Sequence, residues 1–223
     1  MPGAHPDLAL RARRHAALGD PVRLAVAEEL ARSDRAPVEL RERFGLESNL
    51  LAHHLDVLED AGLIGRSKSS GDGRRRYVHL LPAAFPLVAP RPMAATRVVF
   101  VCTQNSARSQ LAAALWEARA GSPATSAGTH PADRVHPGAV AAARRAGLDL
   151  TAARPRVLSA RELRGAVVVT VCDRAHEELG DQLDWLHWSV PDPVPAATRT
   201  AFDAVVAELT ERIDRVATQR SAA

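Results

Sequence analysis

Cys102 and Arg108 have the types and the spacing of residues that bind and attack a tetrahedral oxyanion. The cysteine follows an apolar, β-branched run that predicts a strand, and the arginine stands where a helix is expected to begin. A short loop between strand and helix can turn its amide N–H groups toward an anion, and these groups favour the thiolate of Cys102 over the thiol. The planar guanidinium of Arg108 can hold two anion oxygens. The pattern predicts nucleophilic chemistry at Cys102.

The residues around this pair supply the other expected contacts to the anion. We expect the oxyanion to be held by Thr103, Gln104, Asn105, Ser106, Ala107, Arg108 and Ser109. Asn105 and Ser109 can also donate hydrogen bonds to the thiolate. The alternative interpretation is a buried core cysteine beside a surface arginine.

Composition limits the class of protein. The chain has 223 residues, 46% hydrophobic and 25% charged, which suffices for two modest domains. We find no apolar run of the roughly 18 residues that span a bilayer and no secretory apolar core, so we expect a cytoplasmic protein without a membrane partner. The net charge of +3 does not by itself indicate nucleic-acid binding. With only two cysteines, Cys102 and Cys172, we expect reactive thiols and neither a disulfide framework nor a metal site.

The first part of the chain has the periodicity of short helices. Residues 8–32 predict two helices that meet at a corner, where Asp20 caps the second. A short helix over 38–44 and a longer one over 48–61 follow, and together they predict a helix-turn-helix. The expected buried stripe of the longer helix consists of Leu50, Leu51, Leu55 and Leu58.

An expected β-hairpin follows these helices. Extended segments on either side of the turn 69–73 predict the wing of a winged helix-turn-helix. A basic cluster flanks the turn and consists of Lys68, Arg74, Arg75 and Arg76. In such a domain the second helix enters the major groove and the wing follows the DNA backbone.

Two phrases in this region resemble the arsenic-repressor (ArsR) family of winged-helix regulators. They are Leu18-Gly19-Asp20-Pro21-Val22-Arg23-Leu24 and His54-Leu55-Asp56-Val57-Leu58-Glu59-Asp60-Ala61-Gly62-Leu63-Ile64. The resemblance covers 8–85 and implies a homodimeric repressor domain that binds operator DNA. The implied DNA contacts are Ser48, Asn49, His53, Lys68, Arg74, Arg75 and Arg76.

The chain departs from that family in two ways. It has no cysteine before Cys102, so metalloid sensing by cysteines of the first domain is not expected. The proline-rich stretch 86–95 predicts an extended linker where the family has a further helix of the dimer interface. Dimerisation is therefore expected through the first helix, the second domain, or both.

From 96 to 218 the pattern alternates between strands and helices. Strands are expected at 97–101, 124–127 and 166–171, and helices at 109–120, 137–146, 174–179 and 200–218. The predicted fold is thus a mainly α winged helix-turn-helix followed by an α/β domain with a parallel sheet. Its ligand site is expected at the carboxyl ends of the strands, where Cys102 falls.

This second domain is similar to the low-molecular-weight tyrosine phosphatases. The similarity rests on Cys102-x5-Arg108-Ser109 and on Asp192-Pro193. Three phrases look like the arsenate reductase branch of that fold: Val101-Cys102-Thr103-Gln104-Asn105-Ser106-Ala107-Arg108-Ser109-Gln110, Ser126-Ala127-Gly128-Thr129 and Val169-Thr170-Val171-Cys172-Asp173. The resemblance implies that Cys102 attacks arsenate, that Arg108 and the loop hold it, and that Asp192 is the general acid.

The resemblance also suggests a role for Cys172. It would attack the Cys102–arsenic adduct, release arsenite and leave a disulfide; alternatively, Cys172 is an inert core thiol and a small thiol attacks Cys102. Leu179 stands where thioredoxin-linked relatives have a third cysteine. We expect no tightly bound cofactor, and an external thiol or redoxin as the reductant.

Three functions remain open at this point. The first is a DNA-binding regulator fused to a thiol-dependent arsenate reductase. In the second, the phosphatase-like domain is an oxyanion or redox sensor for the regulator. The third is a protein tyrosine phosphatase, which is less favoured because no aromatic residue follows Pro193 closely.

Overall fold

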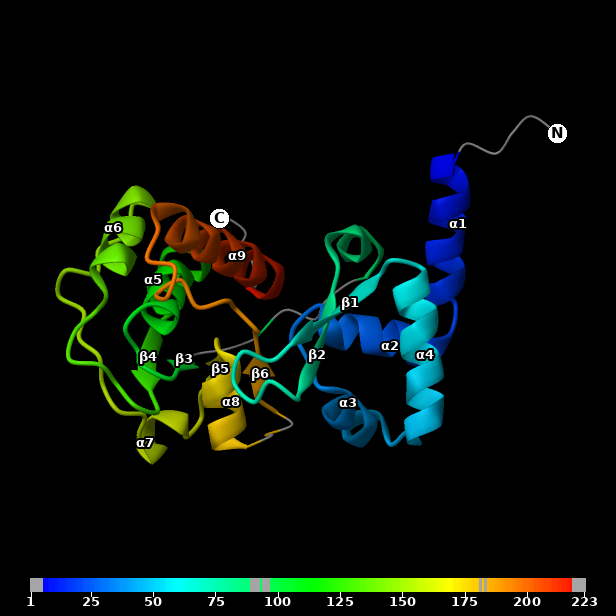
Figure 1. Cartoon of the computed structure of the whole chain (residues 1–223), viewed down its shortest axis with the longest axis horizontal. Coiled ribbons are helices and arrows are strands. Elements are labelled where there is room, and N and C mark those ends of the chain that lie inside the picture. Colours follow the sequence, from blue (N-terminus) through cyan, green and yellow to red (C-terminus); the bar gives the residue numbers. More distant parts are fainter. Residues whose placement is uncertain (1–5, 89–92, 94–96, 181, 183, 218–223) are drawn as a thin grey trace. The chain divides into compact units, whose positions relative to one another are not determined.

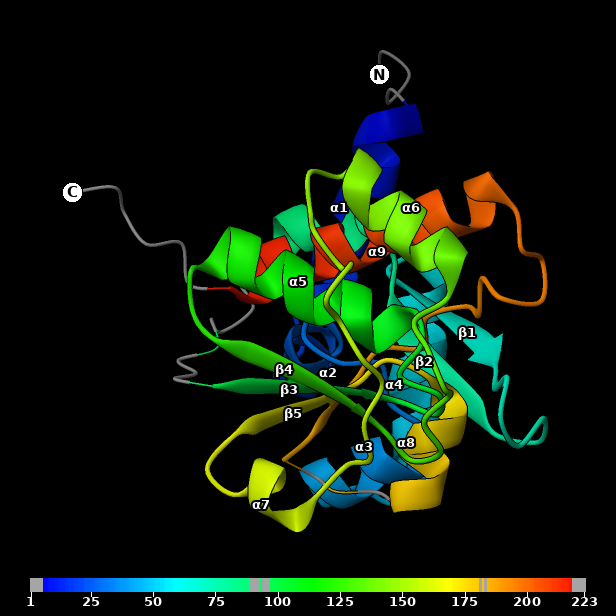
Figure 2. The same ribbon diagram turned by 90° about the vertical axis from the view of Figure 1, so that its left-hand side faces the viewer.

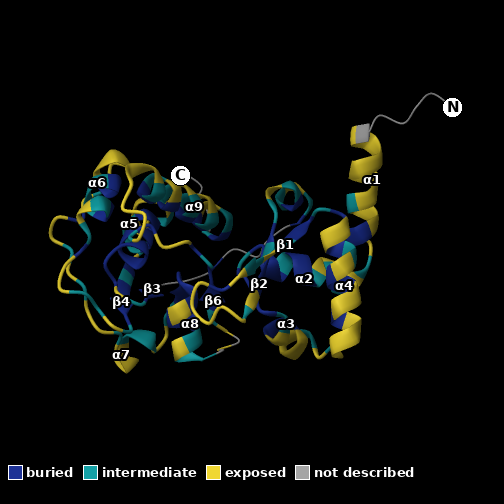
Figure 3. Cartoon of the chain, viewed as in Figure 1, coloured by how far each residue is buried: buried dark blue, intermediate teal, exposed yellow. Residues whose placement is uncertain are grey.

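The chain divides into two compact units. The computed structural model describes residues 6–88, 93, 97–180, 182 and 184–217. One unit comprises Met1–Lys68 with Arg74–Arg91, and the other Ser69–Gly73 with Pro92–Ala223. Each has its own core of buried apolar residues. Figure 3 shows buried residues of both units in dark blue. Among the described residues, no helix is both long and apolar enough to span a membrane.

The first unit is a helix-turn-helix followed by a hairpin (Figure 1). It contains α1 (Pro6–Leu18), α2 (Pro21–Leu30), α3 (Pro37–Phe44), α4 (Ser48–Asp60) and the antiparallel strands β1 (Ile64–Lys68) and β2 (Arg76–Leu80). Asp20 caps α2 by accepting a hydrogen bond from the Arg23 backbone N–H at 3.0 Å. Gly45 ends α3 with a φ of 63°, a conformation that glycine adopts without strain.

Helix α4 buries a narrower stripe than the sequence predicts. Leu51, Leu55 and Leu58 are buried in the core, whereas Leu50 is 44% exposed. The prediction for Leu50 was wrong because it lies about 100° around the helix from Leu51, outside the stripe that spacings of four and three residues form.

The expected linker 86–95 is described only in part. Its first two residues belong to a 3₁₀ helix, η1 (Pro82–Leu87), rather than to an extended segment. A single short 3₁₀ helix tolerates Pro86 because few of its N–H groups have partners to lose. Residues 89–92 and 94–96 lie outside the described part of the chain.

The second unit is an α/β domain. Its elements are β3 (Val98–Cys102), α5 (Arg108–Ala120), β4 (Ala124–Gly128), α6 (Pro137–Arg145), α7 (Ala160–Leu163), β5 (Val167–Thr170), α8 (Asp173–Leu179), β6 (Leu186–His187) and α9 (Arg199–Val216). The strands form one parallel sheet in the order β4-β3-β5-β6. The predicted fold class is therefore confirmed. The sequence did not reveal α7 or the two-residue β6, because both are too short to show a periodicity.

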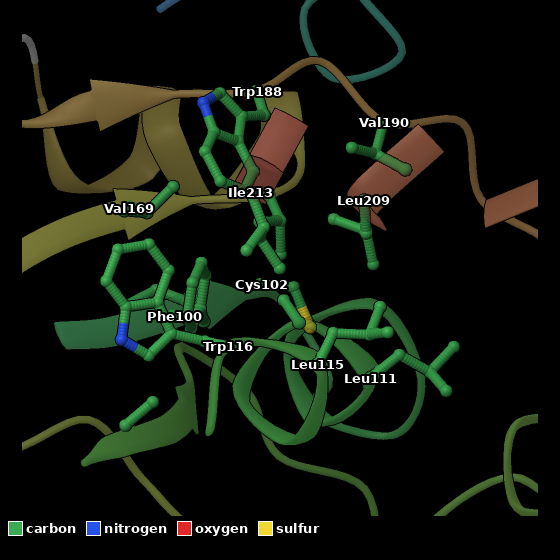
Figure 4. Close-up of a cluster of buried hydrophobic side chains, with 14 of the residues drawn as sticks. Phe100, Cys102, Leu111, Leu115, Trp116, Val169, Trp188, Val190, Leu209 and Ile213 are labelled. Atoms are coloured by element: carbon green, nitrogen blue, oxygen red, sulfur yellow. The ribbon is translucent and has the colours of Figure 1, made fainter. Parts of the chain in front are cut away.

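Helices cover both faces of this sheet. Figure 2 shows α5 and α9 on one face and α8 on the opposite one. All five residues of β3 are buried, which explains their continuous apolar run. Phe100 packs between Trp116 and Trp188, with ring centroids 6.1 and 5.8 Å away (Figure 4). This packing fixes the strand that ends at Cys102.

The strand order brings the two cysteines to neighbouring strand ends. Strands β3 and β5 pair in parallel at the centre of the sheet. After β3 the chain continues to β4 on one side of this pair, and after β5 it continues to β6 on the other side. Ligand crevices in α/β sheets lie at such switch points, at the carboxyl ends of the strands. Cys102 is the last residue of β3, and Cys172 follows β5 by two residues.

Candidate active site

The loop between β3 and α5 surrounds the sulfur of Cys102. The backbone N–H of Asn105 donates to Cys102 Sγ at 3.1 Å, and Ser109 Oγ lies 3.0 Å from the same sulfur. Asn105 has a φ of 48°, an uncommon value for a residue with a side chain. The loop therefore curls around the thiol.

The outer side of the loop is bonded to the segment after β4. Backbone N–H groups of Thr129, His130, Ala132 and His136 donate to the carbonyls of Cys102, Thr103, Gln104 and Ser106 at 2.8–3.2 Å. Because a trans peptide points its N–H opposite to its C=O, the amides that follow these carbonyls face the other way, and Asn105 N–H donates to Cys102 Sγ while Thr103 N–H donates to Cys172 Sγ. Gly128 is required here, since a Cβ would lie 2.6 Å from the Thr103 carbonyl oxygen.

Arg108 joins the loop to the distant Asp192. Its Nη1 donates to the Val190 carbonyl at 3.0 Å, and its Nη2 lies 2.9 Å from Asp192 Oδ2. Arg108 is buried, whereas the Asp192 side chain is 39% exposed. The backbone N–H of Val194 donates to Asp192 Oδ1 and fixes the carboxylate. The guanidinium and the carboxylate therefore lie together beside the loop.

Cys172 contacts the same loop from beyond the carboxyl end of the neighbouring strand β5. The backbone N–H of Thr103 donates to Cys172 Sγ at 3.2 Å, and Thr103 Oγ1 lies 3.4 Å from it. Both cysteines are buried free thiols. Burial raises the pKa of the Cys172 thiol and the charge of Cys102 raises it further, whereas Arg108 and Thr103 act in the opposite direction.

The predicted site residues fall into two sets. The residues predicted to bind the oxyanion or to be catalytic, which are Cys102 to Ser109, Cys172 and Asp192, all belong to the second unit. The predicted DNA contacts belong to the first: Ser48, Asn49 and His53 are exposed on α4, and Lys68, Arg74, Arg75 and Arg76 flank the hairpin turn. Within the described residues, no group of three or more His, Cys, Asp or Glu side chains is placed to hold a metal ion.

Sequence reasoning missed a buried polar network behind Cys172. His187 Nε2 donates to Asp173 Oδ1 at 3.1 Å, and Thr170 Oγ1 lies 2.9 and 3.1 Å from Nδ1 of His187 and His176. The two imidazoles stack with centroids 4.2 Å apart. Burial alone would raise the pKa of Asp173, but its hydrogen bonds, first that from His187, hold the pKa below the usual range. These residues have no regular spacing in the sequence that could have revealed them.

Replacing Asp173 with alanine should lower the free energy of unfolding by about 3 kcal/mol, because His187 loses its buried partner. Since folding lowers the pKa of Asp173, this stabilisation is present above about pH 4 and is lost as the pH falls further. Urea titrations at pH 7 and pH 3 measure both effects. Asp214→Ala, which breaks an exposed pair with Arg119, is the control and should cost less than about 1 kcal/mol. An equally small loss for Asp173→Ala would contradict a stabilising network.

The solved structures that resemble this chain cover about half of it. A low molecular weight protein tyrosine phosphatase from T. tengcongensis is 25% identical and covers 54% of this chain and 96% of its own, with a TM-score of 0.49. An arsenate reductase from Archaeoglobus fulgidus is 30% identical and covers 53% of this chain and 96% of its own, with a TM-score of 0.46.

Sequence comparisons agree with the division of the chain. Residues 18–64 match a model described as a helix-turn-helix domain. A protein of Halobacterium salinarum named "Putative arsenate reductase" is 33% identical over 106 residues, which are 44% of this chain and 75% of the relative. Residues 97–222, more than half of the chain, match the model described as low molecular weight phosphotyrosine protein phosphatase. With its cysteine, arginine and aspartate gathered at one loop, this chain belongs to the low molecular weight phosphotyrosine protein phosphatase family.

Proposed function

We propose that the protein is a DNA-binding transcriptional regulator that carries a thiol-dependent arsenate reductase. The observation that carries the proposal is the sharing of one loop by two thiols: Asn105 N–H donates to Cys102 Sγ and Thr103 N–H donates to Cys172 Sγ. Hydrolysis of a phosphoester needs only the first thiol. A second thiol at the same loop can form a disulfide with the first, and that oxidation supplies the two electrons that reduce arsenate. The name of the Halobacterium salinarum relative supports the same chemistry.

The chemistry proceeds in two steps. The Cys102 thiolate attacks arsenic, and one arsenate oxygen leaves as water with the proton of Asp192, while Arg108 and the loop amides hold the other oxygens. The Cys172 thiolate then attacks Cys102 Sγ. A disulfide forms, the sulfur–arsenic bond breaks, and its electron pair remains on arsenic. Arsenate is thus reduced to arsenite as two thiols are oxidised.

The electrons that regenerate the enzyme must come from another molecule. The chain has two cysteines, and position 179 at the end of α8 is leucine. This chain therefore has no third thiol that could reduce the Cys102–Cys172 disulfide. We propose an external thiol, either a redoxin or a low-molecular-weight thiol, as the reductant.

The direct test is arsenite release by the purified full chain. Arsenate is supplied with thioredoxin, glutaredoxin or mycothiol-type systems in separate reactions, and arsenite is measured. Turnover with at least one system supports the proposal, and none with any of them overturns it. Hydrolysis of an aryl phosphate at a comparable rate would favour a phosphatase, although no aromatic side chain is present in 194–197 to stack on the ring.

Cys172→Ser separates the internal disulfide from direct attack by a small thiol. If Cys172 closes the disulfide, the variant should lose about a hundredfold in turnover because the adduct is no longer resolved. Since the pKa of Cys172 is raised, disulfide closure in the wild type should also accelerate by about tenfold per pH unit near neutrality. Unchanged turnover with glutaredoxin or a small thiol would instead leave Cys172 as a core thiol.

We propose operator DNA as the partner of the first unit. Lys68 and Arg76 are register partners across the β1–β2 hairpin, and both are exposed. Directly opposed like charges destabilise a hairpin unless a counter-charge is supplied, which DNA phosphates would do. Asn49 and His53 lie exposed on α4, in the position of a recognition helix.

Replacing both Lys68 and Arg76 with alanine should weaken DNA binding mainly through phosphate contacts. The slope of log K against log salt should fall by about two, with little change in sequence preference. Fluorescence anisotropy at several salt concentrations measures both quantities. Asn49→Ala is the contrasting variant, because a base contact should change preference and leave the slope unaltered. If the slope of log K against log salt were unchanged in the double variant, Lys68 and Arg76 would not be the residues that contact the DNA phosphates.

We further propose that the regulator acts as a homodimer paired through α1. Leu8 and Leu10 on this helix are 56% and 38% exposed. A second copy of the chain could cover either of these exposed side chains. Sedimentation of the wild type and of Leu8→Glu with Leu10→Glu tests this, since pairing through α1 predicts a monomeric variant.

The sensor hypothesis makes a separate prediction for the same DNA. The first unit contains no cysteine, so a signal would have to arise at Cys102. Operator affinity should then change when arsenate, phosphate or oxidant is added. Identical affinity under all conditions would count against a sensor.

A further inference from the structure

The side-chain amide of Gln110 lies among three hydrogen-bond acceptors, so its NH₂ group must face them. Gln110 is the third residue of α5 and is buried. Its Nε2 lies 3.1 Å from Asn105 O, 3.1 Å from Asn105 Oδ1 and 3.2 Å from the Arg154 carbonyl. A carboxamide oxygen facing these three acceptors would be repelled. The orientation of the Gln110 amide is therefore settled by its surroundings.

The orientation of the Asn105 amide follows from the same inventory. Asn105 Oδ1 accepts from Gln110 Nε2 and, at 3.0 Å, from the backbone N–H of Arg156, which can only donate. Asn105 Nδ2 is thereby turned to Ser109 Oγ, 2.8 Å away, and donates to it. Because Asn105 has a positive φ, these bonds also hold an unfavourable backbone conformation.

The proton of Ser109 is available to the nucleophile. A hydroxyl has a single proton, and Ser109 Oγ already accepts from Asn105. Its proton is free to point at Cys102 Sγ, 3.0 Å away. A thiolate carries no proton, so Ser109 is the donor of this hydrogen bond once Cys102 is ionised, and a donor stabilises a thiolate in preference to a thiol.

We propose that Gln110 is a positioning residue for the nucleophile, acting through Asn105 and Ser109 to keep a hydrogen-bond donor aimed at Cys102. The proposal deepens the role of Cys102 in the proposed function. The test measures the reactivity of the Cys102 thiol and does not use arsenate. The Gln110 proposal and the reductase proposal can therefore each fail without the other.

Gln110→Met tests the donor while keeping the volume of the side chain. Alkylation of Cys102 by iodoacetamide is followed by peptide mass spectrometry from pH 5 to 9. The variant should react roughly threefold to tenfold more slowly at pH 7, with the midpoint of its pH profile shifted upward. Gln182→Met, a change at an exposed position outside the loop, should leave the profile unaltered. A Gln110→Met profile that coincides with the wild type overturns the proposal.

A double-mutant cycle with Ser109→Ala separates positioning from loss of structure. If Gln110 acts through Ser109, its replacement should slow alkylation of Cys102 in the wild type and have no further effect in the Ser109→Ala background. Equal slowing in both backgrounds would show that Gln110 supports the fold alone and would overturn the proposal. The comparison holds even if each variant loses some stability, because each pair differs at one position.

Discussion

Cys102→Ser should abolish arsenate reduction with every reductant. The loss should be at least about ten-thousand-fold, because serine is a far weaker nucleophile and its oxygen cannot be oxidised to a disulfide. In the proposed reaction, Cys102 supplies one of the two thiols whose oxidation gives arsenic its electron pair. Arsenite release in single-turnover and steady-state assays measures the effect.

The serine variant should keep its structure. Its Oγ can retain hydrogen bonds with Asn105 N–H and Ser109 Oγ, the partners of the sulfur in the wild type. Thermal melting and protection of the fold by phosphate are therefore the controls. Arsenite release by the variant above the protein-free rate would show that the reduction takes place at another thiol.

Arg108→Lys should lower kcat/KM for arsenate by about a hundredfold to a thousandfold. The guanidinium is buried and uses two nitrogens at once, one on the Val190 carbonyl and one on Asp192. Lysine keeps the charge but is a point donor that cannot hold two anion oxygens in a plane. In other enzymes, removing one hydrogen-bond donor that faces the developing charge lowers kcat by about a hundredfold to a thousandfold. Steady-state kinetics with a saturating reductant measure the ratio.

Arg145→Lys is the matched control for this substitution. Arg145 pairs with Asp203 at the surface of the second unit and is not part of the loop. The same chemical change there should alter kcat/KM less than twofold or so, because exposed pairs contribute little. If Arg108→Lys also retained nearly full activity, charge alone would suffice and the fork geometry would have no catalytic role.

Elements that repeat a local pattern could be predicted from the sequence. The helix expected at 109–120 is α5 (Arg108–Ala120), and the strand expected at 97–101 is β3. Both are buried runs of the right period, bounded by residues that begin or end them. Leu50 was predicted as buried and is exposed, because residues adjacent in sequence point to different sides of a helix.

Contacts made across the fold could not be predicted in this way. His187 and Asp173 are paired in the core although nothing in their spacing indicates it. Gln110 lies within the loop phrase, yet its proposed role depends on the hydrogen bond that Arg156, from a distant segment, donates to Asn105. Such bonds depend on which segments become neighbours after the chain has folded.

The sequence by itself determined the loop at Cys102 and Arg108, because a strand, a loop and a helix in succession are local structure. Only the tertiary structure decided that Cys172 and Asp192 would meet there. Cys172 arrives because β5 pairs directly with β3, so that their carboxyl ends coincide. Asp192 is held there by its bond to Arg108, which is 84 residues away in sequence. Pairing of distant strands depends on the burial of whole surfaces, which no single stretch of sequence contains.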